Sequence, residues 1–131
     1  MPRRVVITGM GVVTAFGTAL ESFWSGLLEG KSGVAPLSLF DTTEFKVHFG
    51  GQVRDWDPEA LFGAKEARRL DRFAQFAMVA AEKAVTHSGI DFSTLPLEKC
   101  GVLIGSGIGG LNDFETQIGR ASWRERVAGR V

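Results

Sequence analysis

Two short apolar runs, each broken by glycines, constrain the fold of this 131-residue chain more than any other feature. The first, residues 5–8, is β-branched and leads into Gly9 and Gly11 in the segment "VVITGMGVV". The second, residues 102–105, continues through the segment "GVLIGSGIGG". Such runs are typical of strands that are buried on both faces of a sheet and end in tight turns. Both segments therefore predict a strand followed by a glycine turn.

Helical patterns separate the two segments. Thr18 and Glu21 have the spacing of a capping box, and the apolar residues that follow predict a helix that Gly30 ends. The strongest helical periodicity covers residues 65–88, with Gly89 as its stop. Further predictions are a strand near 45–53, a helix entry at Asp57-Pro58, and a new helix near Leu111.

The order strand–helix, strand, helix, strand–helix predicts a layered α/β fold with a largely parallel sheet. With 44% hydrophobic residues, the chain is long enough to bury a core as about one domain. No apolar run reaches the ~18 residues of a membrane span, and no signal peptide is evident. With a single cysteine as well, we expect a cytoplasmic protein. The formal net charge of zero argues against a nucleic-acid partner.

The glycines Gly105, Gly107 and Gly110 have the G-x-G-x-x-G spacing of a dinucleotide-binding turn. This motif normally opens its domain, with an acidic residue about 20 positions later for the ribose. Here it comes late, and Glu125 is the only acid near that distance. The alternative is that the turns need positive φ angles and close backbone packing.

Candidate catalytic residues are few. Cys100 lies at the edge of an expected strand without a histidine neighbour, which favours a buried structural thiol over a nucleophile. His48 and His87 are isolated, and no residues have the spacing of metal ligands. We therefore expect no metal and no cofactor.

Four basic residues form a stripe on the first turns of the predicted alanine-rich helix: Lys65, Arg68, Arg69 and Arg72. The simplest interpretation is a solvated helix face. However, cations at a helix N-terminus oppose the helix dipole, which suggests a surface for an acidic partner.

Four segments together resemble the opening part of bacterial β-ketoacyl-acyl-carrier-protein synthases, most closely the type II elongating enzymes. They are "RRVVITGMGVVTAFG", "FWSGLLEGKSGV", "KEARRLDRFAQFAMVAAEKAV" and "GVLIGSGIGG", and the match runs from about Arg3 to Gln117. The resemblance implies a thiolase-like fold with αβαβα layers and a homodimer. It also implies fatty-acid elongation by decarboxylative condensation, with an acyl-carrier protein and fatty-acyl and malonyl thioesters as partners.

The resemblance also assigns roles to residues. Lys65, Arg68 and Arg69 match the surface that docks the acidic carrier protein, and Ile108 matches the residue that lines and gates the acyl pocket. Neither Cys100 nor the two histidines match the family's nucleophile or histidine motifs, which come later in the family's sequences. The chain is therefore expected to be inactive by itself.

Residues 1–117 form the expected partial synthase domain, and residues 118–131 depart from the family. The segment 118–131 carries four arginines and one glutamate, whereas the preceding residues carry 11 basic and 14 acidic side chains. It resembles the translation of a sequencing-adapter read. We expect a truncated reading frame whose product folds poorly, because its strands would expose apolar faces. Two alternatives are a non-catalytic module that binds a nucleotide or acyl group at the glycine turn, and a chain-length partner of a polyketide synthase.

Overall fold

The computed structural model describes residues 3–111 and 113–118. The chain divides into two compact units. The first unit takes the described part of Met1–Asp57 together with Phe76–Gly101, and the second takes Pro58–Gln75 and the described part of Val102–Val131. Each unit is considered separately below.

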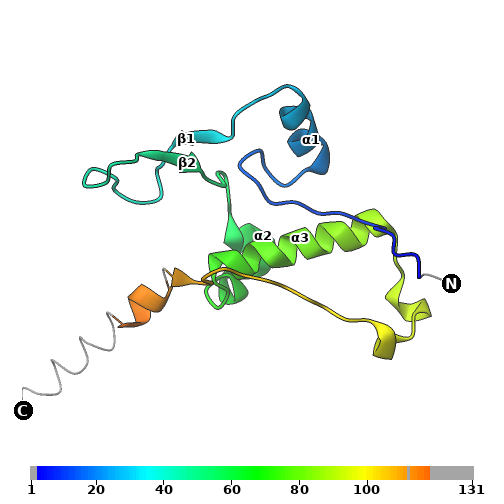
Figure 1. Cartoon of the computed structure of the whole chain (residues 1–131). Helices are drawn as coiled ribbons and strands as arrows, with labels where there is room; N and C mark the ends of the chain where they lie inside the picture. The colour runs from blue at the N-terminus through cyan, green and yellow to red at the C-terminus, as the bar shows by residue number, and fades with distance from the viewer. Residues whose placement is uncertain (1–2, 112, 119–131) are drawn as a thin grey trace, which may run out of the picture. The chain divides into compact units, whose positions relative to one another are not determined.

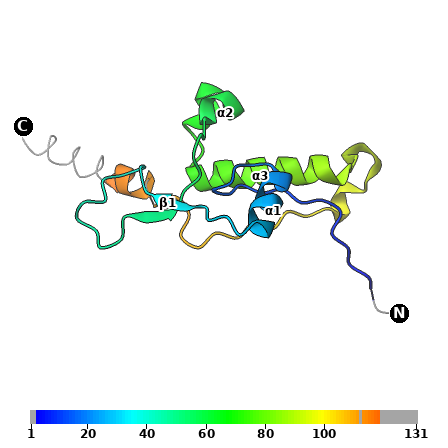
Figure 2. The same ribbon diagram turned by 90° about the horizontal axis from the view of Figure 1, so that it is seen from above.

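The first unit begins with an extended segment that lies along the helix α3 (Arg72–Ser88). The views in Figures 1 and 2 agree that this segment runs beside the later part of α3. A Cβ atom at Gly11 would meet the backbone oxygen of Ala80, and one at Gly9 would meet that of Ala84. The glycines therefore allow two backbones to approach each other closely.

The predicted strand at residues 5–8 is wrong in one respect, because it pairs with no other strand among the described residues. Val5 is 92% exposed and Ile7 81%. The β-branched run gives the extended backbone that its sequence favours, but a strand also needs a hydrogen-bonded neighbour. The same is true of residues 102–105, where Leu103 is 99% exposed.

The helix α1 (Leu20–Leu28) confirms the helix predicted there, but not its predicted cap. Ala19 occupies the N-cap position, and no side chain caps the helix start. The end follows the prediction, because Gly30 has a φ of 65° and the Lys31 amide donates to the Gly26 carbonyl at 2.9 Å. This is a Schellman ending, which requires the left-handed conformation that glycine adopts easily.

In the described part of the chain, β1 (Val34–Pro36) and β2 (Phe49–Gly51) form a two-stranded antiparallel sheet. Its second strand lies inside the predicted range 45–53, whereas the first strand was not predicted. Gln52 ties the hairpin together, because its amide exchanges two hydrogen bonds with Ser38, at 3.0 and 2.9 Å. The largely parallel sheet expected from the element order is not found among these residues.

The predicted helix over 65–88 is interrupted and belongs to two elements, α2 (Pro58–Ala67) and α3. The element α2 is itself kinked at Gly63, whose φ of 75° and ψ of 156° are not helical. The chain turns between them, and Asp71 is the last residue before α3, with its carbonyl accepting from the Gln75 amide at 2.9 Å. The Gln75 side chain stabilises this turn, because its amide donates to the carbonyls of Ala67 and Leu70, and the continuous apolar periodicity gives no sign of it. The predicted helix start at Pro58 and the end at Gly89, with a φ of 64°, are confirmed.

The core of the described residues is small. Val79 is its buried apolar side chain, and Gln52 and Gln75 are its buried polar ones. In the first unit, Trp56 and Phe76 pack edge to face with ring centres 4.7 Å apart. Two 3-10 turns, Phe92–Thr94 and Leu97–Lys99, follow α3. Many large apolar side chains are exposed. The predicted poor solubility was argued from such exposure.

Candidate functional site

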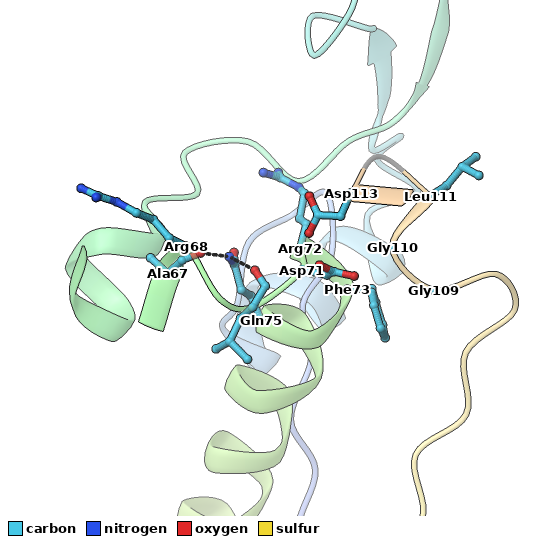
Figure 3. Close-up of a pocket in the computed structure, with 11 residues that line it drawn as sticks. Ala67, Arg68, Asp71, Arg72, Phe73, Gln75, Gly109, Gly110, Leu111 and Asp113 are labelled. Atoms are coloured by element: carbon cyan, nitrogen blue, oxygen red, sulfur yellow. Dashed lines mark hydrogen bonds between the residues drawn. The ribbon is translucent and has the colours of Figure 1, made fainter. Parts of the chain in front are cut away.

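The second unit contains a cavity of about 490 Å³ where the turn between α2 and α3 meets the glycine segment (Figure 3). Polar and charged side chains line it together with two glycines. Those that matter here are Arg68, Asp71, Arg72, Gln75, Gly110 and Asp113.

Gln75 fixes the turn from which the cavity is built. Its side chain is 5% exposed, and its amide nitrogen donates to the carbonyls of Leu70 at 2.8 Å and Ala67 at 3.2 Å. Carbonyls at the end of a helix lack partners within the helix, and Gln75 supplies a donor to them from the next helix. A buried amide with two partners holds the end of α2 against the first turn of α3.

The carboxyl group of Asp71 lies against the backbone of Gly110. A Cβ atom at Gly110 would overlap the Asp71 carboxylate oxygen Oδ2. A new helix begins directly afterwards at Leu111, as predicted, and the Phe114 amide donates to the Gly110 carbonyl at 3.0 Å. In a dinucleotide-binding turn, this glycine makes room for the packing that places a pyrophosphate at the helix start. Here it makes room for a carboxyl group of the same chain.

Asp113 faces Asp71 from the new helix (Figure 3). The pKa of Asp71 is raised, first by its hydrogen bond to the Asp113 carboxyl, then by desolvation and by the negative charge of Asp113. Two carboxyl groups can share a hydrogen bond only when one of them is protonated. The approach of Asp113 therefore favours the neutral form of Asp71.

Ile108 lies on the glycine segment just before this contact. It is 80% exposed, and it precedes Gly109, whose φ is 79°. The Gly109 amide donates to Ser106 Oγ at 3.0 Å, and the Phe73 ring lies 3.7 Å from where a Cβ of Gly109 would be. The positive φ expected of the two glycine turns is found at Gly109 but at none of the glycines that define the patterns, Gly9, Gly11, Gly105, Gly107 and Gly110, so that expectation was wrong for them.

The predicted basic stripe is located differently from the expectation. Lys65 is in the last turn of α2, Arg68 and Arg69 lie in the following turn, and all three are exposed. A cation at a helix C-terminus is favourable to the dipole, so the argument from an unfavourable dipole was wrong for Lys65. It holds for Arg72, which is the first residue of α3. Arg69 also forms an ion pair with Glu66 at 3.1 Å. What remains is an exposed group of three cations, which we call the basic corner.

The candidate nucleophile and histidines are not among the residues that line this cavity. Cys100 is exposed, so the expectation of a buried thiol was wrong, and its Sγ donates to the Pro96 carbonyl at 3.7 Å. His87 accepts from the Met10 amide through Nδ1 at 3.1 Å. His48 lies beside Thr42, with Nδ1 and Oγ1 separated by 3.3 Å. Each histidine has a structural contact inside the first unit.

The first unit has a larger cavity, of about 750 Å³, between residues 9–12, α1 and Ala84. Its walls are mainly apolar and include Phe23, Trp24 and Leu27 of α1. Within the described part of the chain, no group of three His, Cys, Asp or Glu side chains is arranged to hold a metal ion. No helix in that part is long and apolar enough to cross a membrane.

A family model described as "Beta-ketoacyl synthase, N-terminal domain" matches residues 2–129. The chain belongs to the β-ketoacyl synthase family. The resemblance inferred from four sequence segments is thereby confirmed.

Several bacterial synthases are close relatives of this β-ketoacyl synthase chain. It is 42% identical over 115 residues to 3-oxoacyl-(acyl-carrier-protein) synthase 2 of Synechocystis sp., which covers 88% of this chain and 28% of the relative. The enzymes of the same name from Coxiella burnetii and Vibrio cholerae are 45% and 43% identical, over 83% and 87% of this chain. The chain spans about 26–28% of the length of these relatives.

The fold is also that of a ketosynthase. A solved structure described as "The ishigamide ketosynthase/chain length factor" matches with a TM-score of 0.72 and 30% identity, over 98% of this chain and 31% of that one. The predicted α/β, thiolase-like class is confirmed by this match. The division into residues 1–117 and 118–131 stays a prediction, and residues 119–131 lie outside the described part.

Three residues of the cavity were not identified as site residues from the sequence. Asp71 had a signal, because an aspartate before an apolar helical run is typical of an N-cap. Gln75 and Asp113 had none, since their partners lie across the turn and on another helix. The sequence patterns used here detect periodicity along one element and not such contacts between elements.

Proposed function

We propose that the chain is the opening part of a 3-oxoacyl-acyl-carrier-protein synthase that elongates fatty-acyl chains. The observation that carries this proposal is the family match over residues 2–129, supported by relatives that are 42–45% identical. In this reaction an acyl group on an enzyme cysteine thioester is attacked by the carbanion formed when malonyl-carrier protein loses carbon dioxide. The products are 3-oxoacyl-carrier protein, carbon dioxide and the free enzyme thiol.

The chemical steps need an activated cysteine and groups that stabilise negative charge on the thioester oxygen. Cys100 is exposed and its Sγ contacts the Pro96 carbonyl, whereas His48 and His87 contact Thr42 and Met10. We therefore assign no catalytic residue to this chain. Its proposed contribution is to dock the carrier protein and to form part of the acyl pocket.

The basic corner, Lys65, Arg68 and Arg69, is the proposed docking surface. All three side chains are exposed, Lys65 at the end of α2 and Arg68 and Arg69 in the turn that follows it. An acidic carrier protein would meet concentrated positive charge there. Such charges mainly raise the rate of encounter, so their effect should weaken as salt is added.

Ile108 is the proposed acyl-pocket residue. It is an exposed apolar side chain on a turn shaped by two glycines, which can present it to a fatty-acyl chain. The exposed apolar segments 5–8 and 102–105 support the same proposal, because they have the character of sheet strands that pair with other parts of a synthase. We also propose a cytoplasmic homodimer for the complete enzyme.

A second candidate function is a chain-length partner in a polyketide system. The specific observation in its favour is the match to the ketosynthase/chain length factor structure. Such a partner would keep the fold and the docking surface without using a nucleophile.

The deciding experiment is to sequence genomic DNA across codon 117 and to express the complete reading frame found there. A frame that continues into a cysteine nucleophile and two histidine motifs, and whose product condenses acyl and malonyl thioesters, would establish the synthase. A complete frame without the nucleophile that still binds a carrier protein would favour the chain-length partner. A gene that encodes residues 118–131 and then stops would contradict both the synthase and the chain-length partner.

Carrier docking is tested in the same protein by the variant Lys65→Glu/Arg68→Glu. We expect carrier affinity to fall about tenfold at low salt, since exposed ion pairs contribute ~0.2–1 kcal/mol each and reversal turns attraction into repulsion. The matched control is Lys46→Glu, an exposed lysine of the first unit outside the basic corner. Affinity for the carrier protein is measured by titration calorimetry. An equal loss of affinity in the Lys65→Glu/Arg68→Glu and Lys46→Glu variants would contradict docking at the basic corner.

A further inference from the structure

The basic corner has a buried support within the second unit. Gln75 is 5% exposed, whereas Arg68 and Arg69 are exposed on the turn that precedes α3. The Gln75 amide nitrogen donates to the Leu70 carbonyl at 2.8 Å and to the Ala67 carbonyl at 3.2 Å (Figure 3). These two carbonyls belong to the residues directly before and directly after the arginines. One buried nitrogen therefore holds both ends of the segment that carries Arg68 and Arg69.

We propose that Gln75 is a positioning residue for carrier docking, which fixes this turn so that Arg68 and Arg69 are presented together to the acidic partner. The role in docking rests on the proposed function, whereas the support of the turn does not. Because Gln75 is buried, it acts through the backbone of the two arginines and not by contact with the carrier protein.

The turn needs such a support because it lies between two helices. The amides of Arg69 and Leu70 donate to the Glu66 carbonyl at 3.0 and 3.1 Å, which closes the end of α2. The last carbonyls of a helix have no partners within it, and here the donor for Ala67 comes from the Gln75 side chain in α3. Loss of a buried donor leaves its acceptors unsatisfied, so the turn would open to find other partners.

The arginine side chains are oriented mainly by the backbone of the turn. Arg69 pairs with Glu66 at 3.1 Å, but its side chain is 68% exposed, and exposed pairs of this kind contribute little to stability. Figure 3 shows the Arg68 side chain directed away from Asp71 and Asp113. A partner that binds a turn already held in place loses less conformational entropy than one that must first order it.

The variant Gln75→Met tests this role, because methionine has a similar length and donates no hydrogen bond. The matched control is Gln52→Met in the first unit. Gln52 is also a buried glutamine, 7% exposed, and its side chain exchanges two hydrogen bonds with Ser38. The control therefore removes the same number of hydrogen bonds without removing any bond of the basic corner.

Carrier affinity is measured in the complete synthase by titration calorimetry at low salt, with a bacterial acyl-carrier protein as the ligand. We expect about a fivefold loss in Gln75→Met, the effect of about one hydrogen bond, and no loss in Gln52→Met. Hydrogen exchange in peptides covering 66–72 should become faster in Gln75→Met alone. Gln75→Asn has an amide that is one methylene group shorter, so it should show a smaller loss, and it replaces Gln75→Met if that variant does not fold. Equal affinities of the Gln75→Met and Gln52→Met variants would overturn the positioning role.

A mutant cycle separates positioning from general stability. In the background Arg68→Ala/Arg69→Ala, the charges that Gln75 positions are gone, so Gln75→Met should cause no further loss of affinity. A further loss of about fivefold in that background would show that Gln75 acts on folding alone, and it would overturn the proposal.

The same measurements distinguish this proposal from the proposed function. If the charge reversal Lys65→Glu/Arg68→Glu leaves carrier affinity unchanged, docking at the basic corner fails, and the role of Gln75 in docking fails with it. If the charge reversal weakens binding but Gln75→Met binds the carrier protein as Gln52→Met does, docking stands and the positioning role fails alone.

Discussion

The two glycine segments are similar in sequence, but their glycines have different neighbours. At Gly9 and Gly11, an added Cβ would collide with backbone atoms of α3, a helix whose small alanines allow the close approach. At Gly105 and Gly107, an added Cβ would meet nothing within 4 Å among the described residues. In one unit the glycines therefore allow two backbones to pack together. In the other, Gly105 and Gly107 have free space around them, and only Gly110, at the end of the segment, is packed against a side chain.

This comparison teaches that a glycine motif specifies a requirement for space without saying what fills it. In the first unit the space is filled by the backbone of a helix, which cannot move aside. At Gly110 it is filled by the Asp71 carboxyl, which can rotate. The three predictions below test this difference.

The largest effect is expected for Gly11→Ala. The new methyl group would meet the Ala80 carbonyl and the Ala84 amide nitrogen, so the extended segment must move away from α3. Overpacking of this kind costs about 1–3 kcal/mol. We expect faster hydrogen exchange in the segment 3–13 and at the exposed end of α3. The control Gly105→Ala has open space and should stay within about 0.5 kcal/mol of the wild type. Equal effects of the two substitutions would remove the distinction between the segments.

A smaller loss, of about 1 kcal/mol, is expected for Gly110→Ala, because the obstacle is the end of a side chain. The decisive variant is the double mutant Gly110→Ala/Asp71→Ser, in which a shorter N-cap residue leaves room for the methyl group. Exchange in the segment 105–118 should return toward the value of Asp71→Ser alone. Strictly additive losses would show that the Asp71 carboxyl is not what Gly110 accommodates.

Sequence reasoning was most successful where one residue decides a local conformation. Pro58 at a helix start and Gly30 and Gly89 at helix ends were predicted correctly, since each acts through its own backbone angles. The family was also found from the sequence, because four segments in order carry more information than any one of them.

The failures share a physical cause, since each depends on a partner remote in the sequence. The β-branched run at 5–8 was predicted to be a strand, but pairing needs a neighbour that the described residues do not supply. The break at Asp71 was missed because apolar periodicity continues across it, while the buried Gln75 amide stabilises the turn from the next helix. The contact between Asp71 and Asp113 joins the turn before α3 to the helix that follows Gly110, and it has no local signature.

The smallest effect is expected for His87→Ala, which tests how the first segment is held at Met10, between its two glycines. The Met10 amide donates to His87 Nδ1 at 3.1 Å in an exposed position, so its loss should cost about 0.5–1 kcal/mol. His48→Ala is the control, because that imidazole contacts Thr42 instead. Faster exchange at residues 9–12 in His87→Ala alone would show that a side chain adds to the backbone packing. No difference between the two variants would mean that Gly9 and Gly11 hold the segment without it, since the close approach to Ala80 and Ala84 would then suffice.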